Sequence, residues 1–189
     1  MTDKQRLIVI HGYGATPRSH WFPWLAAQVP SVTVEVPELP NPTAPKFDTW
    51  EVVAAEAIAA ADENTVVIGH SLGAVTALNA LAALPEGRRL AGIVLVGGFA
   101  EPLPGYAALD AFTRVPLDIE ALRALTPNRT VFVSDNDAIV DPAITARLAA
   151  RFGADLVTVP GAGHFQETEG KTTFPELLPA LSAAGITVG

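Results

Sequence analysis

Ser71 lies at the centre of the pentapeptide Gly-His-Ser-Leu-Gly, residues 69–73, and is a candidate nucleophile. The β-branched run before it predicts a strand, and the Ala- and Leu-rich segment after it predicts a helix. Glycine on either side of the serine lets strand and helix approach closely, because no Cβ atom is present to collide there. The spacing therefore indicates a sharp turn that presents the hydroxyl for attack. The alternative is a turn that needs glycine for its shape alone, with Ser71 as the helix N-cap.

A serine hydroxyl needs a nearby base to remove its proton, and the sequence contains four histidines. Enzymes that use such a turn place the serine, the acid and the histidine in that order along the chain. His11 and His20 precede the serine, and the side chain of His70 should point away from its neighbour. His164 follows the last predicted strand, in a glycine-rich loop. We therefore expect His164 to be the base; the alternative is an ordinary solvent-exposed histidine.

The acid that orients the base must come from a loop between the serine and the histidine. The segment VFVSDNDAIVDPAI, residues 131–144, offers three aspartates. Asp141 precedes a proline and is explained as a helix N-cap. Asp135 lies directly at the end of the strand, whereas Asp137 lies further into the loop and forms a D-x-x-V arrangement with Val140. We favour Asp137 as the acid and keep Asp135 as the alternative.

The negative charge that forms on an attacked carbonyl oxygen needs N–H donors that are already in place. The backbone N–H of Leu72, directly after the nucleophile, is one candidate donor. The second should come from the loop after the first strand, HGYGATP at residues 11–17, whose glycines let backbone amides turn inward. We expect the amide of Tyr13 to be this donor. The alternative for His11 and Gly12 is a simple turn that ends the strand.

Aromatic residues near these loops are candidates for the walls of a substrate pocket. We expect His11, Trp21 and Phe99 to line it, and the Pro- and Gly-rich loop 97–112 is long enough to border it. The aromatic cluster at residues 21–24 has a second interpretation, in which its large rings anchor the start of a helix in the core. For the cluster as a whole we favour this structural role.

Strand and helix patterns alternate along the chain, which predicts an α/β fold with a mostly parallel sheet of about six strands and helices on both faces. In such a sheet the carboxyl ends of the strands meet at one edge, so the candidate residues should converge there. Continuously apolar, β-branched runs predict strands at residues 6–10, 32–36, 65–69, 92–97, 130–134 and 155–159. Helices are expected from Asp48, as N-cap, to about Ala61, from Ser71 towards Pro85, from Asp141 to about Phe152, and before Gly185.

The composition and charge restrict the class of protein and its partners. A chain of 189 residues, of which 49% are hydrophobic, suits a single domain over residues 1–189 with a full-sized core. The net charge of −8, with no basic run, argues against a nucleic-acid partner. Neither a membrane-spanning segment nor a signal peptide is recognised. The lack of cysteine excludes disulfides and thiolate metal sites and fits a cytoplasmic protein.

With these motifs assembled, the chain resembles an α/β-hydrolase, and specifically the small serine hydrolase family that includes retinoblastoma-binding protein nine and its bacterial relatives. The resemblance implies a core that lacks the first two strands of larger α/β-hydrolases and has no large cap domain. It also implies a triad of Ser71, Asp137 and His164. Retinoblastoma binding is associated with an L-x-C-x-E motif, and a chain without cysteine is not expected to have that partner. The stretches that carry the resemblance are HGYGATPRSHWFPWL (11–25), GHSLGAVTAL (69–78), SDNDAIV (134–140) and GAGHF (161–165).

The sequence therefore predicts a serine hydrolase that cleaves small ester or amide substrates through an acyl-enzyme on Ser71. This chemistry requires neither a metal nor an organic cofactor. Carboxylesterase, amidase and peptidase activities are all compatible with it. Two alternatives stay open: an acyltransferase or lyase with the same triad, and a catalytically silent binding or interaction protein of the same fold.

Overall fold

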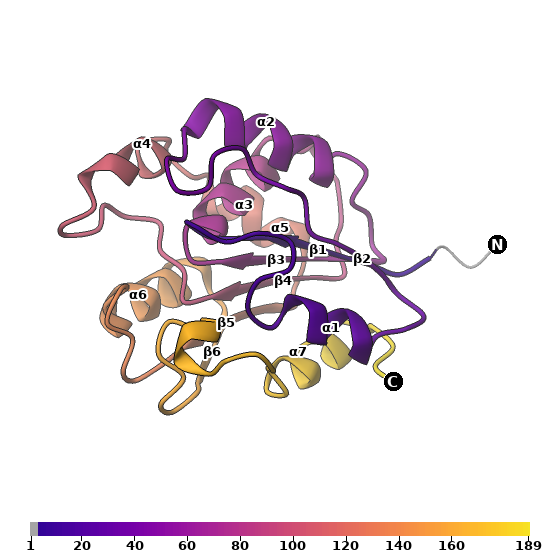
Figure 1. Cartoon of the computed structure of the whole chain (residues 1–189). Coiled ribbons are helices and arrows are strands. Elements are labelled where there is room, and N and C mark those ends of the chain that lie inside the picture. The colour runs from indigo at the N-terminus through magenta and orange to yellow at the C-terminus, as the bar shows by residue number, and fades with distance from the viewer. Residues whose placement is uncertain (1–3) are drawn as a thin grey trace.

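The computed structural model of the protein describes residues 4–189 and contains a sheet of six parallel strands in the order β2-β1-β3-β4-β5-β6 (Figure 1). All six runs predicted as strands form strands, with ends within one residue of those expected. The parallel, mostly consecutive pairing confirms the predicted α/β architecture. The strands are β1 (Arg6–Ile10), β2 (Thr33–Glu35), β3 (Thr65–His70), β4 (Gly92–Val96), β5 (Arg129–Val133) and β6 (Asp155–Thr158).

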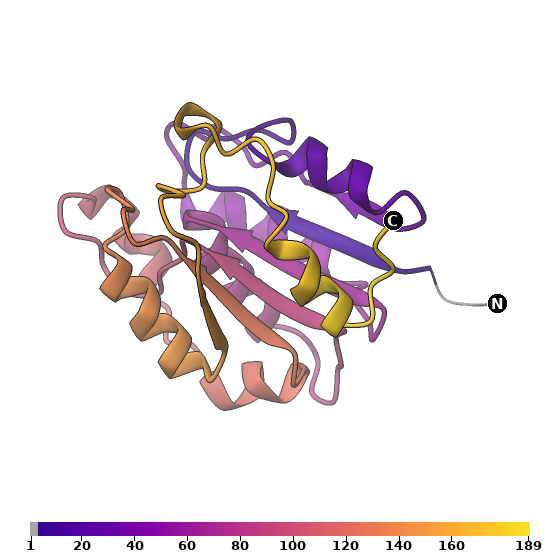
Figure 2. The ribbon, with the colours of Figure 1, turned by 90° about the horizontal axis from the view of Figure 1, so that it is seen from below.

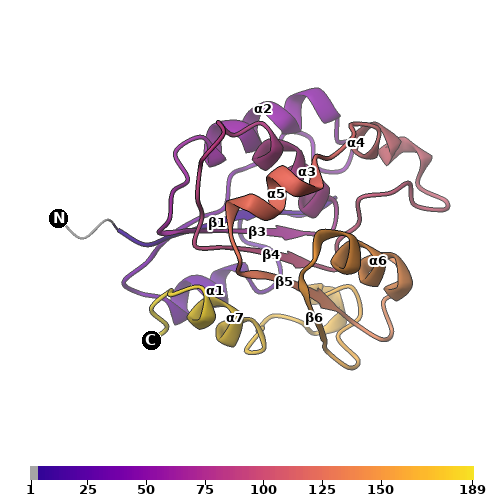
Figure 3. The same ribbon diagram turned by 180° about the vertical axis from the view of Figure 1, so that it is seen from behind.

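Helices cover both faces of this sheet. Helices α1 and α7 lie together on one face, as the view from below shows (Figure 2), and the longer helices pack on the other (Figure 3). The helices are α1 (Phe22–Gln28), α2 (Phe47–Ile58), α3 (Leu72–Ala82), α4 (Asp110–Thr113), α5 (Ile119–Leu125), α6 (Pro142–Phe152) and α7 (Leu177–Ala183). Two single 3₁₀ turns, η1 (Ala107–Leu109) and η2 (Glu167–Glu169), lie in loops. In residues 4–189, none of the helices combines the length and the apolar character needed to cross a bilayer.

The side chains of β1 alternate between two hydrophobic cores. Ile8 and Ile10 pack into the core formed with α2, α3, α5 and α6. Leu7 and Val9 pack into the core formed with α1 and α7. Because both faces of the sheet are buried, successive strand residues must all be apolar, which explains why the runs are continuous rather than alternating.

The ends of two helices show where local signals were sufficient and where they were not. Asp141 caps α6 as predicted, since its carboxylate accepts the N–H of Ala143 at 2.8 Å and Pro142 follows it. Asp48 is not an N-cap, which corrects the expectation for α2: the helix begins at Phe47, and Asp48 lies in its first turn. An acid in the first turn still interacts favourably with the positive end of the helix dipole.

The strands all point the same way, so their carboxyl ends meet along one edge of the sheet. Helix α3 lies at the centre of the fold, and every residue from Leu72 to Leu81 is buried. Its small side chains allow it to pack closely between the sheet and α2. The turn from β3 into α3 is therefore held rigidly at the carboxyl edge, where Ser71 lies.

Candidate active site

Ser71 occupies a strained turn between β3 and α3. Its backbone angles, φ 55° and ψ −123°, lie in a region that residues with a side chain rarely adopt. A Cβ atom on Gly69 would lie 2.5 Å from Cα of Ala74, and one on Gly73 would overlap the carbonyl oxygen of Ile10. Both flanking glycines are thus required by the close approach of backbone. The Ser71 side chain makes no capping hydrogen bond to α3, so the N-cap alternative finds no support in the geometry.

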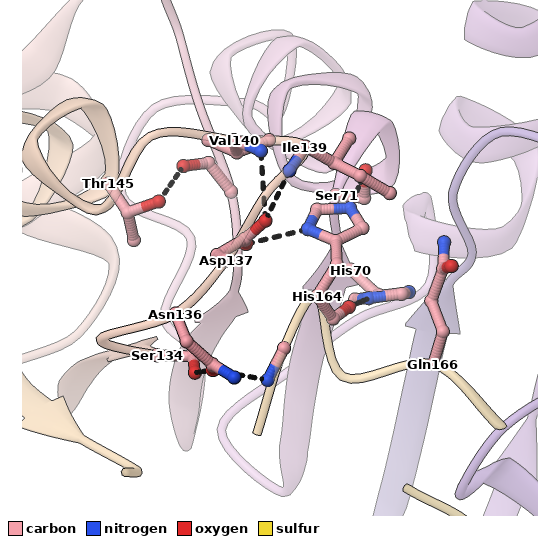
Figure 4. A network of polar contacts seen from close by, with 12 residues as sticks. His70, Ser71, Ser134, Asn136, Asp137, Ile139, Val140, Thr145, His164 and Gln166 are labelled. Carbon is pink, nitrogen blue, oxygen red and sulfur yellow. Dashed lines mark hydrogen bonds and ion pairs between the residues drawn. The ribbon is translucent and has the colours of Figure 1, made fainter. Parts of the chain in front are cut away.

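His164 lies between Ser71 and Asp137 and contacts both (Figure 4). Its Nε2 atom is 2.7 Å from Oγ of Ser71, and its Nδ1 atom is 2.7 Å from Oδ2 of Asp137. When Nδ1–H donates to the carboxylate, Nε2 is left to accept the proton of the serine hydroxyl. The side chains of His164 and Asp137 are only 1% and 2% exposed, so water does not compete for these hydrogen bonds. The three residues therefore form one continuous hydrogen-bonded chain.

The backbone after Asp137 holds its carboxylate in place. Its second oxygen, Oδ1, accepts the N–H groups of Ile139 and Val140, both at 2.9 Å. The D-x-x-V spacing reflects this geometry, in which the loop folds back so that the N–H of Val140 reaches the carboxylate three residues earlier. One oxygen is thereby occupied by backbone and the other is directed at His164.

The alternative acid, Asp135, has a different contact. Its Oδ1 accepts the N–H of Gly161 at 2.8 Å, and the neighbouring Asn136 accepts the N–H of Gly163 at 2.8 Å. These bonds tie the loop after β5 to the loop after β6. Asp135 therefore joins the two loops that carry Asp137 and the histidine, whereas Asp137 itself reaches the ring.

A cavity of about 380 Å³ opens beside Ser71 and His164. Phe99 lines this cavity, as expected from the sequence. The polar lining includes Tyr13 and Gln166. The remaining wall comes mainly from the segment between β4 and α4. Its residues with large side chains are Phe99, Leu103, Tyr106, Leu109 and Ile139, and Ala108 contributes a small one.

The residues expected to supply the N–H donors lie next to Ser71, the candidate nucleophile. Leu72 is the first residue of α3, where a backbone N–H has no partner within the helix. Gly12 lies against Ser71, since a Cβ atom on this glycine would be 2.8 Å from Cβ of Ser71. This contact brings the following residue, Tyr13, to the cavity. Within residues 4–189, no acceptor takes the N–H of Tyr13 or of Leu72.

Comparison with known proteins identifies the family. The family model described as serine hydrolase matches residues 7–183. The chain belongs to this serine hydrolase family. It is 34% identical to YdeN of Bacillus subtilis (strain 168) over 181 residues, which cover 95% of each chain. It is 26% identical to serine hydrolase RBBP9 of Rattus norvegicus over 190 residues, which cover 97% of each chain.

The fold agrees with this assignment. The crystal structure of the ydeN gene product from B. subtilis superimposes with a TM-score of 0.92, at 33% identity, over 97% of this chain and 100% of that chain. The serine hydrolase described here is thus a compact α/β-hydrolase, as the sequence predicted. Its membership confirms the resemblance noted from the motifs and makes it a hydrolase.

Two residues of this serine hydrolase that were expected at the cavity lie elsewhere. His11 is fully buried: its Nδ1–H donates to the carbonyl oxygen of Gly12 at 3.0 Å, and its Nε2 accepts the N–H of Leu39 at 3.2 Å. Burial lowers the pKa of His11 below 6.5, which keeps the ring neutral. It therefore organises the loop after β1 instead of lining the cavity.

Trp21 also lies in the core rather than on the cavity wall. Its ring is fully buried and packs edge-on against Phe22 and Phe174, with ring centroids 4.8 and 5.3 Å away. These contacts lie in the core beneath α1 and α7, on the side of the sheet opposite α3. The anchoring interpretation of the aromatic cluster is therefore the one that the packing supports.

Two residues that sequence reasoning did not assign hold the backbone of His164. The Nε2–H of His70 donates to the carbonyl oxygen of His164 at 2.9 Å, and Oε2 of Glu169 accepts the N–H of His164 at 2.7 Å. Glu169 also accepts the N–H of Gln166, which completes a capping box on η2. The Q-x-x-E spacing at residues 166–169 was the signal that could have revealed this contact.

Three histidine rings of this serine hydrolase lie in a row: His70 and His164 are buried, and His20 is half-buried. The ring of His70 lies 5.2 Å from that of His20 and 5.3 Å from that of His164. Burial lowers the pKa of His70 well below 6.5, and the neighbouring His164 and His20 lower it further. Burial also lowers the pKa of His20, whose Nδ1 accepts the N–H of Glu167. Among residues 4–189, no three His, Cys, Asp or Glu side chains are grouped so that they could hold a metal ion.

Proposed function

We propose that this serine hydrolase cleaves small carboxylic esters or amides by acyl transfer to Ser71 and then to water. The proposal rests on one observation above all: the unbroken chain from Asp137 through His164 to Ser71, with 2.7 Å at each hydrogen bond, beside a cavity. Membership of a serine hydrolase family supports the same reaction class.

In the first step, Oγ of Ser71 forms a bond to the carbonyl carbon of the substrate while its proton passes to Nε2 of His164. The imidazolium that results lies against the Asp137 carboxylate, which stabilises its charge. The carbonyl oxygen becomes negative and accepts the N–H groups of Tyr13 and Leu72. Burial strengthens these interactions, since the ring and the carboxylate are shielded from water.

In the second step, the bond between the carbonyl carbon and the leaving group breaks. His164 donates its proton to the departing alcohol or amine, which leaves an acyl-enzyme on Ser71. A water molecule then attacks the acyl carbon as its proton passes to His164. The bond between the acyl carbon and Oγ of Ser71 then breaks, and His164 returns its proton to Oγ as the free acid leaves, so the enzyme neither gains nor loses a proton over the cycle.

A fluorophosphonate probe followed by mass spectrometry tests the proposal. We expect a single adduct on Ser71 in the wild-type protein and none in Ser71→Ala. A panel of p-nitrophenyl esters and aminoacyl amides then identifies the cleaved bond. Release of free acid in proportion to p-nitrophenol supports hydrolysis, whereas transfer of the acyl group to an added alcohol without free acid supports an acyltransferase. Absence of both labelling and cleavage would contradict the proposal and support a catalytically silent binding protein.

A further inference from the structure

The wall of the cavity beside Ser71 is mainly apolar. Phe99, Leu103, Leu109 and Ile139 supply aliphatic and aromatic surface, and Ala108 adds a small apolar side chain to the same wall. From this wall we infer that the cavity is a subsite for an uncharged, apolar acyl group of medium length. The inference rests on the proposed function, because it assigns the cavity to the acyl part of the substrate that Ser71 would carry.

Charge is absent from the lining. None of the described residues that line the cavity is a Lys, Arg, Asp or Glu. The two carboxylates that contact His164 are already engaged, since Asp137 binds its ring and Glu169 accepts its backbone N–H. An ammonium or carboxylate on the acyl group would therefore lose its hydration without gaining an ionic partner, which is strongly unfavourable.

The volume sets the length of the group. The cavity has a volume of about 380 Å³, which lies within the range of small-molecule sites. We take the occupant to be an unbranched acyl chain of about six to eight carbon atoms, a group of medium size for a small-molecule site. Acetyl or propionyl groups would leave most of the apolar wall uncovered. Longer chains would extend into solvent.

The wall is anchored to the core, so the cavity exists before a substrate binds. Figure 1 shows the segment after β4, with α4, on the side toward which the strands point. Phe112, at the end of this segment, packs against Trp50 with ring centroids 5.6 Å apart. Its carbonyl oxygen accepts Nδ2–H of Asn79, which lies on the buried helix α3, at 3.0 Å. A preformed apolar site binds an apolar group without the entropic cost of ordering a loop.

The acyl group, rather than the leaving group, is the occupant that this geometry favours. The acyl carbon stays bonded to Ser71 in both steps, and Ser71 itself lines the cavity. A chain in the cavity thus keeps the acyl carbon beside His164 until water has attacked. The leaving group departs after the first step and needs no such site.

A series of p-nitrophenyl esters that differ only in the acyl chain tests the inference. We expect kcat/KM to rise about fourfold for each added methylene from acetate to heptanoate, as full burial of a methylene predicts, and to level off beyond octanoate. The 6-aminohexanoyl ester matches the heptanoyl ester in length but ends in an ammonium group. We expect it to react at least a hundredfold more slowly, and the adipoyl monoester, which ends in a carboxylate, to do the same.

A matched pair of variants locates the subsite. Ala108→Trp places a large ring on the cavity wall and should lower the ratio of heptanoate to acetate kcat/KM at least tenfold. Ala183→Trp makes the same change at an exposed position on α7, away from the cavity, and should leave the ratio unaltered.

A fluorophosphonate adduct on Ser71 combined with a flat chain-length series would overturn the subsite while the proposed function stands. A dependence on the alcohol rather than the acyl chain would overturn it equally. Absence of the adduct and of all ester cleavage would overturn both.

Discussion

The ring of His70 donates its Nε2 proton to the carbonyl oxygen of His164 at 2.9 Å, so the residue before the candidate nucleophile holds the backbone of the candidate base. Both rings are almost fully buried, and the same His164 ring reaches Ser71 and Asp137 at 2.7 Å. The histidine is thus oriented through its backbone as well as through its side chain. Such preorganisation matters because small displacements of a catalytic group greatly reduce the rate.

His70→Asn and His70→Gln separate this positioning role from simple packing. The side-chain amide nitrogen of glutamine takes about the place of Nε2, whereas that of asparagine does not reach it. We expect kcat to fall roughly tenfold or more in His70→Asn, since misplacement of a catalytic group by about 1 Å can lower the rate a hundredfold. His70→Gln should keep most of the activity, with KM similar in both. Ester kinetics and thermal midpoints check this; equal kcat values in the two variants would contradict it.

Ser71→Ala should lower turnover by about 10³–10⁶-fold, because the hydroxyl oxygen is the proposed nucleophile. Ser71→Gly should lose activity to the same extent but unfold at higher denaturant. Glycine relieves the strain of φ 55°, which alanine does not, and we expect about 1 kcal/mol in favour of Ser71→Gly. Urea unfolding of the two variants measures the difference. Equal stability would show that the turn is not strained by its side chain.

Asp137→Asn should reduce kcat/KM by about 10³–10⁴-fold, since an amide at this place favours the wrong tautomer of the neighbouring histidine. Asp135→Asn is the matched control. Its side-chain oxygen can still accept the N–H of Gly161, so we expect less than a threefold change. Steady-state kinetics on one ester are sufficient. A larger loss in Asp135→Asn than in Asp137→Asn would reverse the assignment of the acid.

Gly73→Ala should unfold the protein or destabilise it by more than about 4 kcal/mol, in the exceptional part of the range for single substitutions. The added Cβ atom would overlap the carbonyl oxygen of Ile10, and neither the backbone of β1 nor that of α3 has room to move. Gly87→Ala provides the comparison: its φ of +82° is unfavourable for alanine, but nothing lies within 4 Å of the new atom, so only the backbone conformation is penalised. We expect Gly87→Ala to lower the free energy of unfolding by only about 1 kcal/mol. Denaturant midpoints and circular dichroism distinguish the two.

The free energy of unfolding should decrease as the pH falls below about 6.5. Burial lowers the pKa of His11, His20 and His70 in the folded state, so the unfolded chain binds more protons in this range. The stability that these neutral histidines contribute is fully present above the pKa of the unfolded chain. It is lost as the pH falls towards the pKa of the folded state, by up to about 1.4 kcal/mol per pH unit for each histidine. Urea unfolding at a series of pH values from about 5 to about 8, around the ordinary histidine pKa, measures how the free energy of unfolding changes with pH. His70→Gln should flatten this dependence, and an unchanged slope in that variant would exclude His70 as a source.

The sequence by itself determined the architecture and the order of the candidate residues. Continuous apolar runs mark the central strands β1, β3 and β4, because a sheet buried on both faces favours apolar residues at successive positions. Asp141 followed by Pro142 marked the start of α6, because both signals act within one turn of helix. Gly69 and Gly73 indicated the tight turn, since only a side chain reduced to hydrogen fits there. Each of these features depends on a local pattern, and local patterns can be seen in the sequence.

Only the tertiary structure decided which side chains face the cavity. Asp135 and Asp137 are two residues apart, and the return of the loop onto the Asp137 carboxylate determines which one reaches His164. His11 and Trp21 lie near the first loop in sequence, yet both turn into the interior. The direction of a side chain just beyond a strand depends on contacts with residues far along the chain, such as Leu39 for the histidine and Phe174 for the tryptophan. No local pattern encodes those contacts, because they arise only when the layers of the fold pack together.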